Sequence, residues 1–130
     1  MTPEVGAQPD WPRCAERLLA MRKLAVVLTL GSRGCEVATA EGTWSIGAHR
    51  VEAVDTVGAG DAFSGALAVA LAEGRSPLEA AAWANAAAAL AVTQPGAQSA
   101  LPNRDAIDRL AARGAPPYRM ASGGGSCAIF

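Results

Sequence analysis

The chain has 130 residues, 51% of them hydrophobic and 18% charged, a composition that fits one globular domain and excludes an intrinsically disordered chain. Its 11 basic and 12 acidic residues give a formal net charge of −1, so charge gives no reason to expect nucleic acid or an anionic membrane as a partner. The three cysteines are widely spaced and form no CxxC pair, which argues against a disulfide framework or a zinc site and favours the reducing cytoplasm.

The N-terminal part of the chain predicts a leader, a helix and a strand. Residues 1–9 contain two prolines and no periodicity, and we expect a flexible leader there, without the basic and apolar regions of a signal peptide. Asp10 is a candidate cap for a short helix through CAERLLAMRK. The apolar run Leu24–Leu30 predicts a strand buried on both faces, as in a parallel sheet flanked by helices. No apolar run reaches membrane-spanning length.

The middle of the chain predicts a hairpin, a further strand and a helix. CEVAT and TWSIG are two short strand patterns joined around Glu41–Gly42. Residues 49–54 are expected to form one more strand. Small and apolar residues at helical spacing then predict a helix that begins at Ala59 or Gly60 and stops at Gly74.

Two further helices are predicted in the C-terminal third. Residues 76–79 read Ser-Pro-Leu-Glu, a capping serine with proline at the first helical position, and the helix should continue to about Thr93. Asn103 can cap a last helix that ends at Gly114. We expect the remaining residues, 114–130, to be a disordered tail. The order of the elements indicates an α/β layering.

The motif DTVGAGDAF, residues 55–63, has the pattern of an anion-binding corner. A strand that leads through small residues into a helix presents unpaired backbone N–H groups and the positive end of the helix dipole. Gly58, Ala59 and Gly60 allow a phosphate to approach the backbone. Asp61 would repel that phosphate, unless it accepts the proton of a hydroxyl that attacks it. The alternative is a glycine-rich turn in which Asp61 only caps the helix.

The run from Asp55 to Ala68 resembles the second signature of the PfkB/ribokinase family of carbohydrate kinases. TLGSRG at 29–34, RVEAVDT at 50–56 and NAAAALAVTQPGAQ at 85–98 extend the resemblance over residues 10–113. It implies an α/β fold, the C-terminal part of a ribokinase-like doubly wound α/β/α domain. The N-terminal half of the family fold, with its lid and sugar pocket, has no counterpart in this sequence.

The resemblance also implies an activity, the phosphorylation of a sugar hydroxyl with ATP. Ribose is the leading substrate, and fructokinase-like or nucleoside-kinase-like members are alternatives. Asp61 matches the family's catalytic base, and the amides of Gly58, Ala59, Gly60 and Asp61 match its anion hole. The residues that match the nucleotide site are Thr29, Gly31, Ser32, Gly34, Gly60 and Asn85.

Two cations accompany ATP in the family, Mg²⁺ and K⁺. For K⁺ the resemblance implies the side chain of Asp55 and the carbonyl groups of Val57, Ala91, Gln94 and Gly96, hard oxygen ligands that suit such an ion. Ala100, beside Ser99, stands where ribokinases commonly have serine, which weakens this site. The Asn-x-x-Glu motif that organises magnesium in the family is absent from the sequence.

Each assignment has a structural alternative. TLGSRG can be a strand and a glycine turn, Asn85 can face solvent, and Asp55 can cap its own turn. His49 matches no family position and is expected to be an ordinary strand or loop residue. Trp11, Trp44 and Trp83 are expected to be packing residues.

The expected partners are ATP and a small sugar, and the expected location is the cytoplasm. Because the acceptor pocket is missing, we expect little or no sugar kinase activity from these 130 residues alone. A separately encoded N-terminal half, or a second copy as in full-length members, is a possible protein partner. The competing interpretation is a non-catalytic fragment that binds nucleotide or another protein.

Overall fold

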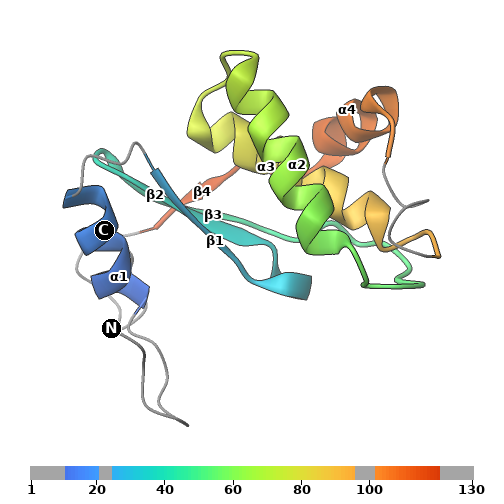
Figure 1. Cartoon of the computed structure of the whole chain (residues 1–130), viewed down its shortest axis with the longest axis horizontal. Coiled ribbons are helices and arrows are strands. Elements are labelled where there is room, and N and C mark those ends of the chain that lie inside the picture. Colours follow the sequence, from blue (N-terminus) through green and yellow to red (C-terminus); the bar gives the residue numbers. More distant parts are fainter. Residues whose placement is uncertain (1–10, 21–24, 96–101, 121–130) are drawn as a thin grey trace, which may run out of the picture.

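The computed structural model describes residues 11–20, 25–95 and 102–120, which form a sheet with helices on both faces (Figure 1). In chain order the elements are α1 (Trp11–Ala20), β1 (Ala25–Thr29), the 3₁₀ turn η1 (Gly31–Arg33), β2 (Cys35–Thr39), β3 (Gly42–Ile46), α2 (Ala59–Ala72), α3 (Pro77–Ala91), α4 (Arg104–Arg113) and β4 (Tyr118–Arg119). The fold is mixed α/β, as predicted.

The four strands of the described sheet lie in the order β1-β2-β3-β4, and all neighbouring pairs are antiparallel. The predicted hairpin is confirmed, because Thr39 pairs with Gly42 across the turn between β2 and β3. The expectation of a parallel strand buried on both faces is wrong for β1. Its residues are at most half-buried, and its described partner is the antiparallel strand β2.

The two faces of the sheet carry different helices, because side chains alternate along a strand. Ala25 and Val27 of β1 join the main core beneath α2, α3 and α4, which also contains Cys35 and Val37 of β2. Their neighbours Val26, Leu28 and Ala38 face the other way and pack with Ala15 of α1. The result is a layered α/β/α arrangement with α1 alone on one side among the described helices (Figure 1).

Helices α2 and α3 form an antiparallel hairpin with the predicted caps. Gly74 ends the α2 segment with φ of 89°, a left-handed conformation that glycine adopts readily. The Ser76 hydroxyl then accepts a hydrogen bond from the Glu79 backbone N–H at 3.2 Å, and Pro77 occupies the first turn of α3. Both features follow directly from the sequence, and these helix predictions are confirmed.

The contact between α2 and α3 is made largely by alanine. Most buried residues of the two helices are alanines: Ala62, Ala66 and Ala70 on α2 and Ala80, Ala81, Ala84, Ala86, Ala87 and Ala91 on α3. Small side chains allow two helix backbones to approach closely, and the interface then depends on the sum of many small dispersion contacts. Cys35 lies in the core beneath them, where burial raises the pKa of its thiol to about 12 and makes it an inert packing residue.

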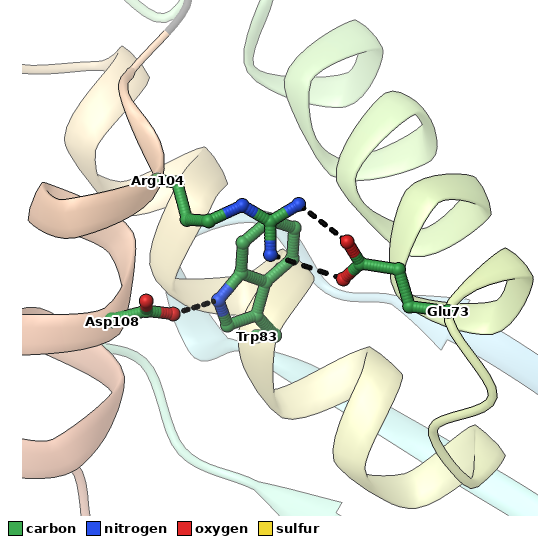
Figure 2. A network of polar contacts seen from close by, with 4 residues as sticks. All are labelled: Glu73, Trp83, Arg104 and Asp108. Atoms are coloured by element: carbon green, nitrogen blue, oxygen red, sulfur yellow. Dashed lines mark hydrogen bonds and ion pairs between the residues drawn. The ribbon is translucent and has the colours of Figure 1, made fainter.

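Helix α4 is attached to this hairpin through Trp83, which is 5% exposed. Figure 2 shows the indole N–H donating to a carboxylate oxygen of Asp108 at 2.7 Å, while the Arg104 guanidinium lies 5.2 Å from the ring centroid. Arg104 also makes a bidentate pair with Glu73, at 3.0 and 2.6 Å. The predicted packing role of Trp83 is confirmed, because its buried side chain connects α3 to α4, while Arg104 connects α4 to Glu73 directly after α2. The predicted cap of α4 is confirmed as well, since the Asn103 side chain accepts from Ala106 N–H at 2.8 Å.

Two predictions about strands are wrong. Residues 49–54 form a loop, because the N–H groups of Val54 and Asp55 donate to the carbonyl of Val92 at the end of α3 rather than to a sheet partner. Tyr118–Arg119, expected in a disordered tail, form β4 on the edge of β3. The Arg119 guanidinium holds it there by donating to the Glu41 carbonyl at 2.7 Å.

The predicted leader at 1–9 and the end of the tail at 121–130 lie outside the described residues. Within the described part, no helix has the length and apolar character needed to cross a bilayer.

Gly34 allows the loop after β1 to approach the end of β3. Its φ is 91°, and a Cβ atom there would overlap the carbonyl oxygen of Ile46 and lie 2.9 Å from the amide nitrogen of Ala48. Gly31 also has a positive φ, 58°, but a Cβ atom at Gly31 would meet nothing within 4 Å.

We therefore expect Gly34→Ala to cost roughly 2–4 kcal/mol of unfolding free energy, since backbone strain and overlap with rigid backbone add. Gly31→Ala is the matched control and should cost only about 1–2 kcal/mol, the strain of a left-handed backbone alone. Urea unfolding of both variants measures the difference. Equal losses would mean that the close approach at Gly34 carries no energetic weight.

Candidate functional site

A cavity of about 560 Å³ lies where the loop after β1, the loop after β3, the start of α2 and one face of α3 meet. Its lining includes all the residues that the sequence resemblance matches to a nucleotide site: Thr29, Gly31, Ser32, Gly34, Gly60 and Asn85. These residues come from three separate segments of the chain, which the fold brings to one place.

The loop after β1 forms one wall of the cavity. Leu30 N–H donates to the Gly34 carbonyl at 2.8 Å, and Gly34 N–H donates to the Gly31 carbonyl at 3.2 Å. These bonds close a tight turn over η1, which leaves the side chain of Ser32 exposed. The structural alternative for TLGSRG, a strand followed by a glycine turn, therefore describes its backbone correctly, and the same turn faces the cavity.

Asn85 fixes a second wall. Its side chain is buried, 7% exposed, and its amide group donates to the Gly47 carbonyl at 2.9 Å. The alternative that Asn85 faces solvent is wrong. Since Gly47 follows β3, this hydrogen bond ties the loop that carries residues 48–53 to the middle of α3.

The loop of the DTVGAGD motif is held by its own backbone and by the end of α3. A carboxylate oxygen of Asp55 accepts from Val57 N–H at 2.9 Å, so the expectation that Asp55 can cap its own turn is confirmed. The N–H groups of Val54 and Asp55 donate to the Val92 carbonyl at 2.7 and 3.0 Å. Gly58 then enters α2 in a left-handed conformation, with φ of 84°.

This conformation leaves amides free at the start of α2. Ala59 N–H donates to the Thr56 carbonyl at 3.3 Å, whereas no described residue accepts from the N–H groups of Gly58, Gly60 or Asp61. Together with the helix dipole, free amides at a helix N-terminus favour an anion. Ala59 and Gly60 line the cavity, so this end of α2 borders it.

Asp61 lies in the first turn of α2 and is exposed. The alternative that it caps the helix is wrong, because Gly58 is the cap residue and no side-chain cap is formed. No described residue forms a hydrogen bond or ion pair with its carboxylate. Its side chain is therefore available to a ligand one residue beyond the cavity wall.

The residues matched to a potassium site gather at the C-terminal end of α3 as far as the structure describes them. Ala91 ends that helix, Gln94 follows it, and Asp55 is bound to neighbouring Val92 through its backbone. The negative end of a helix dipole favours a cation at this place. Gly96, Ser99 and Ala100 lie outside the described residues. In the described part no group of three His, Cys, Asp or Glu side chains is placed to hold a metal ion.

The sequence interpretation gave no role to several residues of the cavity wall, among them the polar residues His49 and Arg50. His49 was expected to be an ordinary strand or loop residue. It is half-buried, and burial lowers the pKa of its imidazole. The only feature of the sequence that could have indicated a site role for His49 is its place directly before the segment RVEAVDT, which leads into the DTVGAGDAF motif.

Residues 7–104 match the family model described as pfkB family carbohydrate kinase. Ribokinase of Bacillus subtilis is 40% identical over 92 residues, which are 71% of this chain and 31% of that protein. The crystal structure of ribokinase from Thermotoga maritima superposes with a TM-score of 0.70 at 39% identity, over 76% of this chain and 33% of that one.

A fructokinase double mutant from Vibrio cholerae, solved with fructose, ADP and potassium ion bound, gives a TM-score of 0.65 at 37% identity. That match covers 73% of this chain and 33% of the fructokinase chain. The chain thus spans about a third of the length of these proteins.

Proposed function

The chain belongs to the pfkB family of carbohydrate kinases, and from this premise we propose that it supplies the nucleotide-binding and phosphoryl-transfer part of a kinase that phosphorylates a sugar hydroxyl with ATP. The observation that carries the proposal is the cavity, whose wall contains every residue matched to the nucleotide and borders the free amides of α2. The ADP bound in the similar fructokinase supports the same assignment.

In this proposal the start of α2 performs the transfer. The amides of Gly58, Gly60 and Asp61 stabilise the charge that develops on the transferred phosphoryl group. The Asp61 carboxylate accepts the proton of the attacking sugar hydroxyl, as a general base does. Its exposure and its lack of a described partner support this role, because a carboxylate engaged in a cap would not be available.

Ribose is the first candidate substrate, since the matched relatives include ribokinases, and fructose is the second. A comparison of kcat/KM for the two sugars decides between them. The acceptor pocket itself is assigned to no residue of this chain.

We further propose that K⁺ binds at the C-terminal end of α3, through Asp55 and the carbonyl groups of Val57, Ala91, Gln94 and Gly96. The carboxylate and the terminal carbonyl groups of a helix suit such a cation. The potassium bound in the similar fructokinase supports the choice of ion. Mg²⁺ would arrive with ATP, and no residue of this chain is assigned to it.

The remaining part of the kinase, in the same polypeptide or a separate one, would cover two open surfaces of this chain. Among the described strands β1 pairs only with β2, so its other edge is open. Val69 and Leu71 of α2 are each 43% exposed. A second copy of the chain is the alternative occupant, and a nucleotide-binding fragment without kinase activity is the alternative function.

The catalytic assignment predicts that Asp61→Asn lowers kcat for sugar-dependent ADP formation by roughly 10²–10⁴-fold, the usual contribution of a general base, while ATP binding is retained. The variant should be expressed from the native gene, so that any further part of the kinase is present. Asp105→Asn is the matched control, because Asp105 is also an exposed acid in the first turn of a helix, α4. A loss for both variants, or for neither, would contradict the role of Asp61.

The potassium assignment predicts that replacing K⁺ by tetramethylammonium, which is too large for a carbonyl cage, lowers the phosphorylation rate several-fold. Returning K⁺ should restore the rate in the native protein and should have little effect in Asp55→Asn. A rate that is the same in both salts would contradict the site.

The mass of the intact protein isolated from its native cells separates the kinase from the fragment. A mass well above that of 130 residues, or a stable complex with a second polypeptide, is expected for the kinase. A free 130-residue protein that forms no ADP with either sugar would support the non-catalytic alternative.

A further inference from the structure

His49 is a cavity residue to which the family resemblance gives no role. It lies on the loop after β3 that Asn85 ties to α3 through the Gly47 carbonyl. Both His49 and Asn85 line the cavity, and His49 is the only histidine of the sequence. The imidazole thus shares the cavity with the Asn85 amide and stands on a loop that this amide ties to α3.

The other side of the imidazole is backed by Gly114, the residue that ends α4. A Cβ atom on Gly114 would lie 2.7 Å from Cε1 and 3.4 Å from Nε2 of His49. The φ of Gly114 is −69°, which any residue adopts, so the backbone conformation does not require glycine here. The absence of a Cβ atom at Gly114 leaves room for the imidazole. The Gly114 backbone behind it prevents the imidazole from moving further in that direction.

The chemistry of this wall suits an aromatic heterocycle. The side chains that α3 and the residue after it place on the wall are apolar apart from the Asn85 amide: Ala88, Ala89 and Val92. Because burial lowers the pKa of His49, its ring is mainly neutral at neutral pH, with one donor and one acceptor nitrogen. A flat neutral ring can stack on a base or form a hydrogen bond with its edge. By contrast, the start of α2 offers backbone N–H groups that no described residue accepts from, and these suit phosphate.

We propose that His49 contacts the nucleobase of the bound nucleotide and that Gly114 is a positioning residue for its imidazole. The inference rests on the proposed function, because it presupposes that the cavity binds a nucleotide. It adds a base-recognition residue outside the family motif and gives the end of α4 a part in binding.

The test compares two ligands that differ by the nucleoside, ATP and inorganic tripolyphosphate, both with Mg²⁺, by calorimetric titration of the full protein. His49→Ala should weaken ATP binding by roughly tenfold, in the range measured for loss of base stacking, and leave tripolyphosphate binding unchanged. Gly114→Ala should give the same selective loss, because its methyl group displaces the imidazole. In the double variant the two losses should not add, since no ring remains to be displaced.

Gly65→Ala is the control, because Gly65 is exposed on α2 and a Cβ atom there meets nothing within 4 Å. It should change neither affinity. Equal losses of both ligands in His49→Ala would make the residue merely structural and overturn the inference, as would an unchanged ATP affinity. A native protein that binds tripolyphosphate as tightly as ATP would overturn the inference about His49 and leave the proposed function standing. A native protein that binds neither ligand would overturn the proposed function and this inference with it.

Discussion

The close antiparallel packing of α2 against α3 determines where the functional groups lie. Because their contact is built from alanines, the two helices run side by side, and the N-terminus of α2 meets the C-terminus of α3. The Val92 carbonyl accepts both N–H groups of the loop that leads into α2, which fixes this meeting point. Opposite ends of two helix dipoles therefore adjoin, so a site for phosphate and a site for a cation can share one corner of the molecule.

An alanine interface has a cost, because small side chains bury little apolar area each. Trp83 and Arg104 together connect the three helices at the far end of the hairpin. The indole N–H donates to Asp108, the ring lies beneath Arg104, and Arg104 pairs with Glu73 directly after α2 (Figure 2). Together with the buried Ile107 of α4, these contacts attach α4 to the hairpin. Since α4 ends at Gly114, which backs His49, packing around Trp83 also determines the position of one cavity wall.

The sequence predicted well those features of the fold that depend on residues close together in the chain. The caps at Ser76 and Asn103 and the stop at Gly74 specify the helices locally, and all three are found. The sequence predicted poorly what depends on a distant partner. Residues 49–54 have strand-like composition, yet the N–H of Val54 bonds to Val92 at the end of α3. The strand β4 forms by pairing with β3, a distant segment, with Arg119 bonded to the Glu41 carbonyl. The motifs named the residues of the cavity, but His49 carries no motif and was placed there by the fold alone.

Every residue assigned to the nucleotide lies between positions 29 and 92, and the fold of this chain alone brings them to one cavity. The proposed nucleotide binding therefore requires only the fold of this chain. Phosphoryl transfer also requires an acceptor held in line with the phosphate, and positioning supplies much of the rate of such reactions. The two properties are thus physically separable. Under the proposed function, the cavity retains affinity for a nucleotide in any context in which α2 and α3 remain packed, while turnover depends on the part of the protein that holds the sugar in front of Asp61.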